Sequence, residues 1–391
     1  MSKTIHYDSK FLESTDNLKR VVKKSLGLEL NSEVAKGAAI CLRHGRLYFE
    51  AAEKSPMEIK PLLIFYGIVN YSKGLVIARN LMKIEALPQA HGLRDISSQT
   101  SRLKELTVKS EGNGTFQQFN DSICKLDYVD YKNARLNRYD YITVPTAESS
   151  SLENRELTLK DILARMHRLA SLYSETFCED AKTIHCDISY SDRQYRLAEL
   201  RITAGDTFND AESRTHIIDN LKARYPFLEK WCLIEACGDS DHSFFKFINF
   251  DESSCAVISN KGGEMVNGQY DVGSSIIMGL RSKQYKCVNF WDITQPTGGS
   301  PESGTYLIEP FDKIWISEFS LYYLGMFLLS SLVRYRPQIW MHSLSRLATS
   351  DLPSDDAALA LVEKFLEDTL NVFPSAVVKA MSMKTNSPPS E

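Results

Sequence analysis

The chain has 391 residues and a formal net charge of −4. This length is too great for one small core and predicts two or three structural units. Hydrophobic residues make up 43% and charged residues 25%, which excludes a disordered, collagen-like or disulfide-rich chain. The acidic balance provides no overall positive field, so a nucleic-acid ligand would need a local basic patch.

The first 99 residues predict a helical part of the fold. The apolar run 38–52 fits either a helix or a hairpin. Pro61 suits the first position of a helix, because its missing N–H has no partner there in any case. The stretch 62–87 is apolar on nearly every face, which predicts a deeply buried helix that ends before Pro88.

The middle of the chain predicts mostly strands. Residues 100–150 are expected to form strands and turns, because aromatic and polar residues alternate there. Thr158 and Asp161 resemble a capping box that starts a helix running to Phe177. On this helix, we expect His167 to face solvent. A second helix and several short aromatic-rich strands follow.

Helices return at the end of the chain. The longest apolar window, 319–333, is shorter than a bilayer span and predicts a buried core helix. Pro337 opens another helical turn or kinks this helix. The last helix is expected to end at Pro374.

The two apolar helices indicate how the ends of the chain are arranged. The helices expected at 62–87 and 317–334 are both too apolar to stand alone in water, so burial against each other is strongly favourable. The expected fold is therefore α+β. Residues 1–99 and 313–391 would form one helical bundle, and residues 100–312 would be an inserted, mainly antiparallel β region with two helices.

Sequence motifs for cofactors and metals are missing from the chain. No two of its eight cysteines have C-x-x-C spacing, and it contains neither H-E-x-x-H nor a glycine-rich phosphate loop. We therefore expect no metal and no cofactor. The first residues lack an apolar leader, which predicts a cytoplasmic protein with reduced thiols and no membrane contact.

Several cationic and amide side chains interrupt the two apolar helices. We expect six residues to converge if those helices pack together: Asn70, Lys73, His91, Arg94, Arg334 and Arg336. Such a basic pocket would suit a phosphate or carboxylate, because arginine presents a planar fork of donors. The alternative is structural, with Lys73 reaching the rim and the arginines pairing with acidic residues of the inserted β region or with helix carbonyls.

Arg336 and His342 also suggest a catalytic alternative. Five residues separate them, and HEPN-type metal-independent ribonucleases use an arginine and a histidine at such a spacing. The arginine would stabilise negative charge while the histidine moves a proton. Against this, an α-helix would place the two about 120° apart around its axis, and Pro337 directly follows the arginine.

Two segments resemble the YaaC-like family of bacterial proteins. The first is AAEKSPMEIKPLLIFYGIVNYSKGLVIARN followed by HGL at 91–93, and the second is LVRYRPQIW at 332–340. The resemblance covers the helical framework and implies an intracellular bacterial protein without an established activity. It also implies that the positions carrying the likeness form one set: Asn70, Lys73, His91, Arg334, Arg336 and Trp340.

Three functional hypotheses follow from these observations. The leading one is that the bundle holds a nucleotide or RNA ligand in its basic pocket, within nucleotide metabolism or a bacterial defence complex. The second is a HEPN-like ribonuclease, and the third is an adaptor subunit that binds a protein partner. A homo-oligomer is compatible with each of them.

Overall fold

The computed structural model divides the chain into two compact units. The helical unit comprises Met1–Leu126, Thr146–Ala181 and Ile316–Thr385, and the sheet unit comprises Asp127–Pro145, Lys182–Trp315 and Asn386–Glu391. The residues that the structure describes are 9–99, 102–126, 128–133, 137–143, 145–191, 197–205, 211–238, 243–249, 258–259, 265–266, 269–270, 277–278, 297–300, 304–345 and 356–383.

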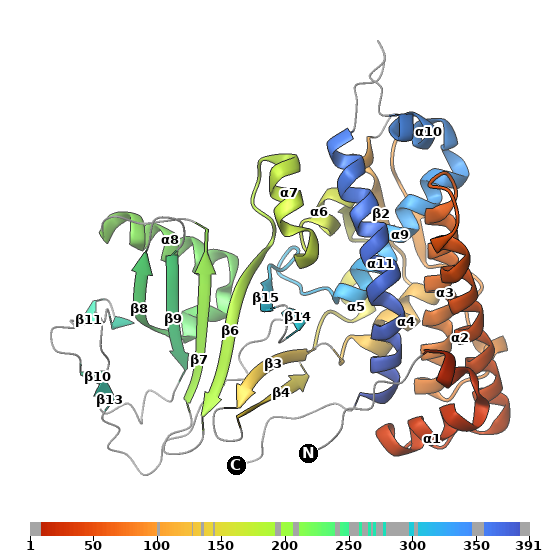
Figure 1. Cartoon of the computed structure of the whole chain (residues 1–391), viewed down its shortest axis with the longest axis horizontal. Coiled ribbons are helices and arrows are strands. Elements are labelled where there is room, and N and C mark those ends of the chain that lie inside the picture. Colours follow the sequence, from red (N-terminus) through yellow and green to blue (C-terminus); the bar gives the residue numbers. More distant parts are fainter. Residues whose placement is uncertain are drawn as a thin grey trace. The chain divides into compact units, whose positions relative to one another are not determined.

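The helical unit confirms the expected bundle of N- and C-terminal helices. Helix α3 packs against α2, α9 and α11, which come from opposite ends of the chain (Figure 1). Its helices are α1 (Thr15–Leu26), α2 (Ser32–Glu53), α3 (Lys60–Asn80), α4 (Thr115–Ile123), α5 (Ser149–Leu152), α6 (Leu159–Leu163), α7 (Ala170–Phe177), α9 (Glu318–Tyr335), α10 (Pro337–Ser345) and α11 (Asp356–Ser382). A small antiparallel sheet joins β1 (Leu93–Asp95), β2 (Thr107–Ser110) and β5 (Glu156–Thr158).

The run 38–52 is part of helix α2, which settles the choice between a helix and a hairpin.

Glycines let α2 and α3 approach closely. A methyl group at Gly67 would lie 2.2 Å from Cδ2 of Phe49, and one at Gly45 would lie 2.7 Å from Cγ of Tyr71. Side chains of one helix therefore fill the space that a Cβ atom of the other would need.

Gly67→Ala is expected to destabilise the helical unit by about 1–3 kcal/mol, because the added methyl overpacks against Phe49. Gly37→Ala on α2 is the matched control, since its methyl would meet Ile84 at an ordinary 3.5 Å. Because alanine has a higher helix propensity than glycine, Gly37→Ala should raise the free energy of unfolding by up to about 1 kcal/mol. Urea unfolding of both variants checks this, and equal destabilisation would contradict close packing at Gly67.

Two helix ends differ from the sequence prediction. Helix α3 stops at Asn80, before Pro88, because Leu81 adopts a left-handed conformation with φ of 54°. Helix α11 continues through Pro374 instead of ending there. Burial of Phe373 and Val377 on either side offsets the hydrogen bond that the proline removes.

The stretch 100–150 also departs from its prediction. It contains helix α4, whose buried face includes Phe116 and Phe119, where only strands and turns were expected. The capping box of Thr158 and Asp161 is confirmed, but its helix ends at Leu163 and a second helix begins at Ala170. Both pieces pack with the bundle. Residues 100–126 and Thr146–Ala181, which were expected in the β region, therefore belong to the helical unit.

The sheet unit confirms a mainly antiparallel β region. Its main sheet has the order β14-β15-β6-β7-β9-β8, and β3 joins β6 in parallel while pairing with β4. Helix α8 (Ala211–Arg224) contributes Ile217, Ile218 and Leu221 to the core under this sheet. The strands of the sheet are β3 (Tyr128–Asn133), β4 (Arg138–Thr143), β6 (Thr183–Ser191), β7 (Leu197–Ala204), β8 (Cys232–Gly238), β9 (Ser243–Asn249), β14 (Thr297–Ser300) and β15 (Gly304–Ile308). Shorter pairs are β10 (Ile258–Ser259) with β13 (Ile277–Met278) and β11 (Met265–Val266) with β12 (Gln269–Tyr270).

By length and composition, one helix of the described chain could cross a membrane. This helix is α3, and 72% of its most apolar window is buried inside the protein. A core helix of a bundle passes the same test, so the finding is weak support for a membrane span.

Candidate functional site

A polar stripe runs along the otherwise buried middle of helix α3. Between Ile64 and Ala78, only Tyr66, Asn70 and Lys73 are half-buried, and every other residue is buried. Their spacing of four and three residues places them on one face of the helix. The stripe is therefore the accessible face in the middle of α3.

His91 is held against this helix by a tight loop. Gly92 adopts a φ of 74°, which favours glycine. The His91 carbonyl accepts a 3.0 Å hydrogen bond from the backbone N–H of Phe116, at the start of α4. The imidazole then packs edge-on to Phe65, with ring centroids 5.1 Å apart. The loop and α4 thus fix the ring beside α3 before any ligand binds.

Two cations act on this histidine. Burial lowers the pKa of His91, and the positive charges of Arg334 and Lys73 lower it further. The Nδ1 atom of His91 is buried and has no hydrogen-bond partner in the described part of the chain. The ring is therefore neutral at physiological pH and retains an unused polar atom. We call this group of two cations and one neutral imidazole, Lys73, Arg334 and His91, the cationic cluster.

Arg334 reaches the cluster from the end of α9. Its guanidinium carbon lies 6.0 Å from the centroid of the Phe65 ring and 4.9 Å from that of Tyr335. Its Nε donates a long 3.4 Å hydrogen bond to the carbonyl of Ser330. Among the residues that the structure describes, neither Arg334 nor Lys73 has a carboxylate partner. Aromatic packing, and not an opposite charge, holds this cation in place.

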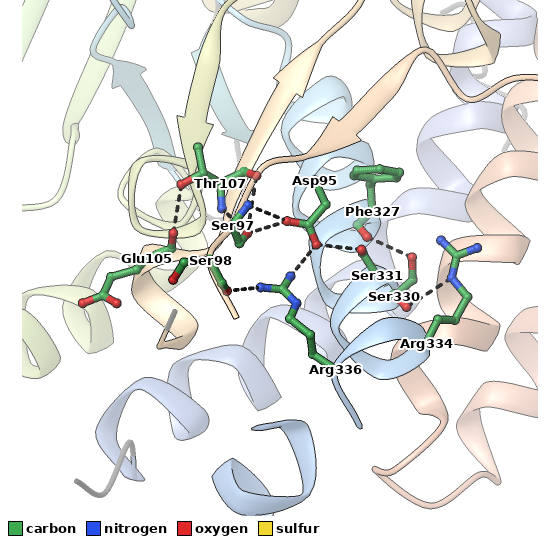
Figure 2. Close-up of polar contacts among 10 residues, drawn as sticks. All are labelled: Asp95, Ser97, Ser98, Glu105, Thr107, Phe327, Ser330, Ser331, Arg334 and Arg336. Atoms are coloured by element: carbon green, nitrogen blue, oxygen red, sulfur yellow. Dashed lines mark hydrogen bonds and ion pairs between the residues drawn. The ribbon is translucent and has the colours of Figure 1, made fainter. Parts of the chain in front are cut away.

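Arg336 points away from Arg334 and toward Asp95 (Figure 2). Its side chain is 3% exposed, pairs with the Asp95 carboxylate and donates a 3.0 Å hydrogen bond to the Ser98 carbonyl. Ser331 also donates to Asp95, at 2.7 Å. The structural alternative weighed from the sequence is right that an acidic residue pairs with this arginine. The partner, however, lies in the N-terminal part of the helical unit and not in the inserted β region.

The remaining sequence candidates lie outside the cluster as well. Arg94 is exposed and forms a 2.7 Å ion pair with Glu111. His342 lies on α10, where its Nε2 atom is buried without a hydrogen-bond partner among the described residues. Trp340, on the same helix, donates from Nε1 to the Met57 carbonyl at 3.2 Å. The structure thus brings together His91, Lys73 with its neighbour Asn70, and Arg334.

Comparison with known proteins identifies the family of this chain. A family model described as YaaC-like Protein matches residues 10–381. The chain belongs to the YaaC-like family. No curated protein and no solved structure matches it. The match extends over nearly the whole YaaC-like chain, whereas the likeness seen in the sequence covered only the framework segments.

A second polar cluster in this YaaC-like chain was not recognised from the sequence. Nδ1 of His167 lies 3.0 Å from Oε1 of Glu318, and Nε of Arg168 lies 3.5 Å from Oδ1 of Asp368. The Tyr322 hydroxyl donates to the Asp368 carboxylate. The only signal in the sequence is the spacing of Glu318 and Tyr322, which places both on one face of α9.

The expectation that His167 faces solvent is wrong, since its residue exposure is 7%. Burial would raise the pKa of Glu318, but the charges of His167 and Arg168 outweigh it and lower that pKa. Burial raises the pKa of Asp368, and the Tyr322 hydrogen bond opposes this. The positive charge of Arg168 acts on both carboxylates, so this network joins α9, α11 and the segment before α7. No three His, Cys, Asp or Glu side chains in the described ranges could hold a metal ion.

Acidification is expected to reduce stability through His91. The pKa of His91 lies below its ordinary 6.5 in the folded protein, whereas the unfolded chain keeps the ordinary value. Between these two pKa values the unfolded chain binds more protons, so stability falls as the pH falls through that window. His91→Gln removes this contribution. Urea unfolding from about pH 7 to about pH 5 should show a shallower pH dependence for the variant, and an unchanged dependence would contradict the assignment.

Proposed function

We propose that this protein binds a phosphate-bearing ligand, such as a nucleotide or an RNA end, at the cationic cluster. One observation carries the proposal. Lys73 and Arg334 are close enough to His91 for both charges to lower its pKa, yet neither cation has a carboxylate partner among the described residues. Like charges held together destabilise a protein, and a bound anion would relieve their repulsion.

The chemistry of the three side chains supports an anion with several oxygens. Arg334 offers a planar fork of donors, and Lys73 offers a compact ammonium. The imidazole of His91 can donate one further hydrogen bond. These groups come from α9, α3 and the loop before β1, so they can approach an anion from separate directions. Asn70, on the same face of α3, donates its amide N–H to the Tyr66 carbonyl, so its amide oxygen would accept a hydrogen bond from a ligand hydroxyl and not from the phosphate.

The other two hypotheses receive less support. A HEPN-like ribonuclease would use Arg336 with His342, but Arg336 is buried and engaged by Asp95. An adaptor subunit would need a binding surface for a partner, and no described patch favours a particular one. A place in nucleotide metabolism or a defence complex would follow from the identity of the ligand.

The test is a thermal-shift screen of the full chain with pyrophosphate and a panel of nucleotides. A ligand at about 100 times its Kd stabilises by about 2.7 kcal/mol, which raises the Tm by several degrees. In the double variant Lys73→Gln with Arg334→Gln, we expect this shift to disappear. The Tm without ligand should stay equal or rise, because two repelling charges are gone.

Arg94→Gln is the matched control for the loss of positive charge. Arg94 follows the His91 loop, is exposed and pairs with Glu111. Its variant should keep the full response to ligand. If no compound in the panel raises the Tm, or if the double variant responds as the parent does, the proposal fails.

A further inference from the structure

An exposed aromatic ring lies beside the cationic cluster. Tyr335 is the last residue of α9 and is 68% exposed, the largest value among the exposed large hydrophobic side chains of the described chain. Exposed single side chains are common and by themselves indicate nothing. The position of this ring against the guanidinium of Arg334 is what makes it informative.

Arg334 contacts one buried and one exposed aromatic ring. Phe65 is fully buried, whereas Tyr335 is mostly in solvent. The guanidinium carbon lies 6.0 Å and 4.9 Å from the two ring centroids. The buried ring anchors the cation, and most of the tyrosine ring surface stays accessible. A ligand anion at Arg334 would therefore lie next to an accessible π-face.

We infer that the ligand is a nucleoside phosphate monoester, with its phosphate at the cationic cluster and its base stacked on Tyr335. This inference rests on the proposed function. Sites for single-stranded nucleic acid combine cations for the phosphate with aromatic rings for the bases, because every base has a π-face. A sugar phosphate or an inorganic phosphate would leave the tyrosine unused.

A terminal phosphate fits the cluster better than a phosphodiester does. Lys73 and Arg334 carry two permanent positive charges, and His91 brings a third donor. A monoester offers up to two negative charges and three free oxygens, whereas a diester offers one charge and two free oxygens. Charge and donor number therefore match the monoester. A free nucleotide and a phosphorylated end of RNA or DNA share this chemistry.

Titration calorimetry of the full chain separates the contributions. The probes are a nucleoside monophosphate, the same nucleoside without phosphate, ribose phosphate without a base, and the cyclic nucleotide as the diester. We expect the monophosphate to bind more tightly than each of the others. Equal binding of ribose phosphate and the monophosphate overturns this inference while leaving the proposed function intact. Absence of binding by every probe overturns both.

Substitution of the tyrosine provides the second measurement. Tyr335→Ala should weaken binding of the monophosphate about tenfold or more, and should leave ribose phosphate unaffected. Tyr335→Phe keeps the ring and should retain parental affinity. Because Tyr335 is exposed, both variants are expected to fold, and circular dichroism checks this. An unchanged affinity in Tyr335→Ala overturns the stacking assignment.

A terminally phosphorylated oligonucleotide distinguishes the two sources of the ligand. Tighter binding of the oligonucleotide than of the mononucleotide assigns a nucleic-acid end. Equal or weaker binding assigns a free nucleotide. Either result supports the inference, provided that removing the terminal phosphate abolishes binding. Retained binding after its removal contradicts the monoester assignment.

Discussion

Arg336→Ala is expected to destabilise the helical unit by about 3–5 kcal/mol, because it leaves the Asp95 carboxylate buried without its cation. The side chains are 3% and 14% exposed, so water can solvate the abandoned charge only poorly. The Ser331 hydroxyl would still donate to Asp95. This hydrogen bond reduces the destabilisation but does not replace the positive charge of Arg336. Thermal unfolding should show a Tm lower by roughly 10 °C.

Arg94→Ala is the control for this prediction. Its ion pair with Glu111 is exposed, and pairs of that kind contribute at most about 1 kcal/mol. The double variant Asp95→Asn with Arg336→Met should recover part of the loss, since neither charge is then left alone. Similar Tm values for Arg336→Ala and Arg94→Ala would contradict a buried, structural role for Arg336.

Gly92→Ala is expected to destabilise the protein by about 2–4 kcal/mol and to weaken ligand binding at the cationic cluster. Its φ of 74° disfavours a side chain, and a methyl group would lie 1.8 Å from Oε1 of Gln117. Gln117 is held by its own hydrogen bond to the Gly92 carbonyl, at 2.8 Å, so it cannot move freely. The loop must therefore shift and carry His91 with it.

Gly27→Ala isolates the backbone part of this effect. Gly27 ends α1 with a similar φ of 71°, but a methyl group there meets nothing within 4 Å. That variant should cost about 1 kcal/mol and leave the thermal-shift response to ligand unchanged. Urea unfolding measures both variants. If Gly92→Ala and Gly27→Ala lower the free energy of unfolding equally, the contact between the Gly92 loop and Gln117 adds nothing to the effect of Gly92→Ala.

Much of the helical framework could be predicted from composition alone. The apolar stretches around Phe65 and Phe327 predicted buried helices, because so many large side chains are stable only out of water. Helix ends were predicted less well. Leu81 ends α3 through its backbone conformation, and α11 passes through Pro374, since tertiary packing outweighs local preference at both sites.

Within the candidate site, the residue types were predictable but their partners were not. Asn70 and Lys73 share a helix face because of their spacing, which any α-helix imposes. Arg334 and Arg336 differ by two positions and project in different directions from the end of α9. The partner of Arg336 is Asp95, which is remote in the sequence, and no periodicity identifies such a partner.

The sequence by itself determined that this protein has two buried apolar helices carrying unusual cations and a mainly antiparallel β region. It did so because burial of apolar surface depends on composition and spacing, which are local properties. Only the tertiary structure decided which cations are neutralised and which are not. Charge pairing depends on distances between remote segments, so Arg336 meets Asp95 while Lys73 and Arg334 are left beside a neutral His91.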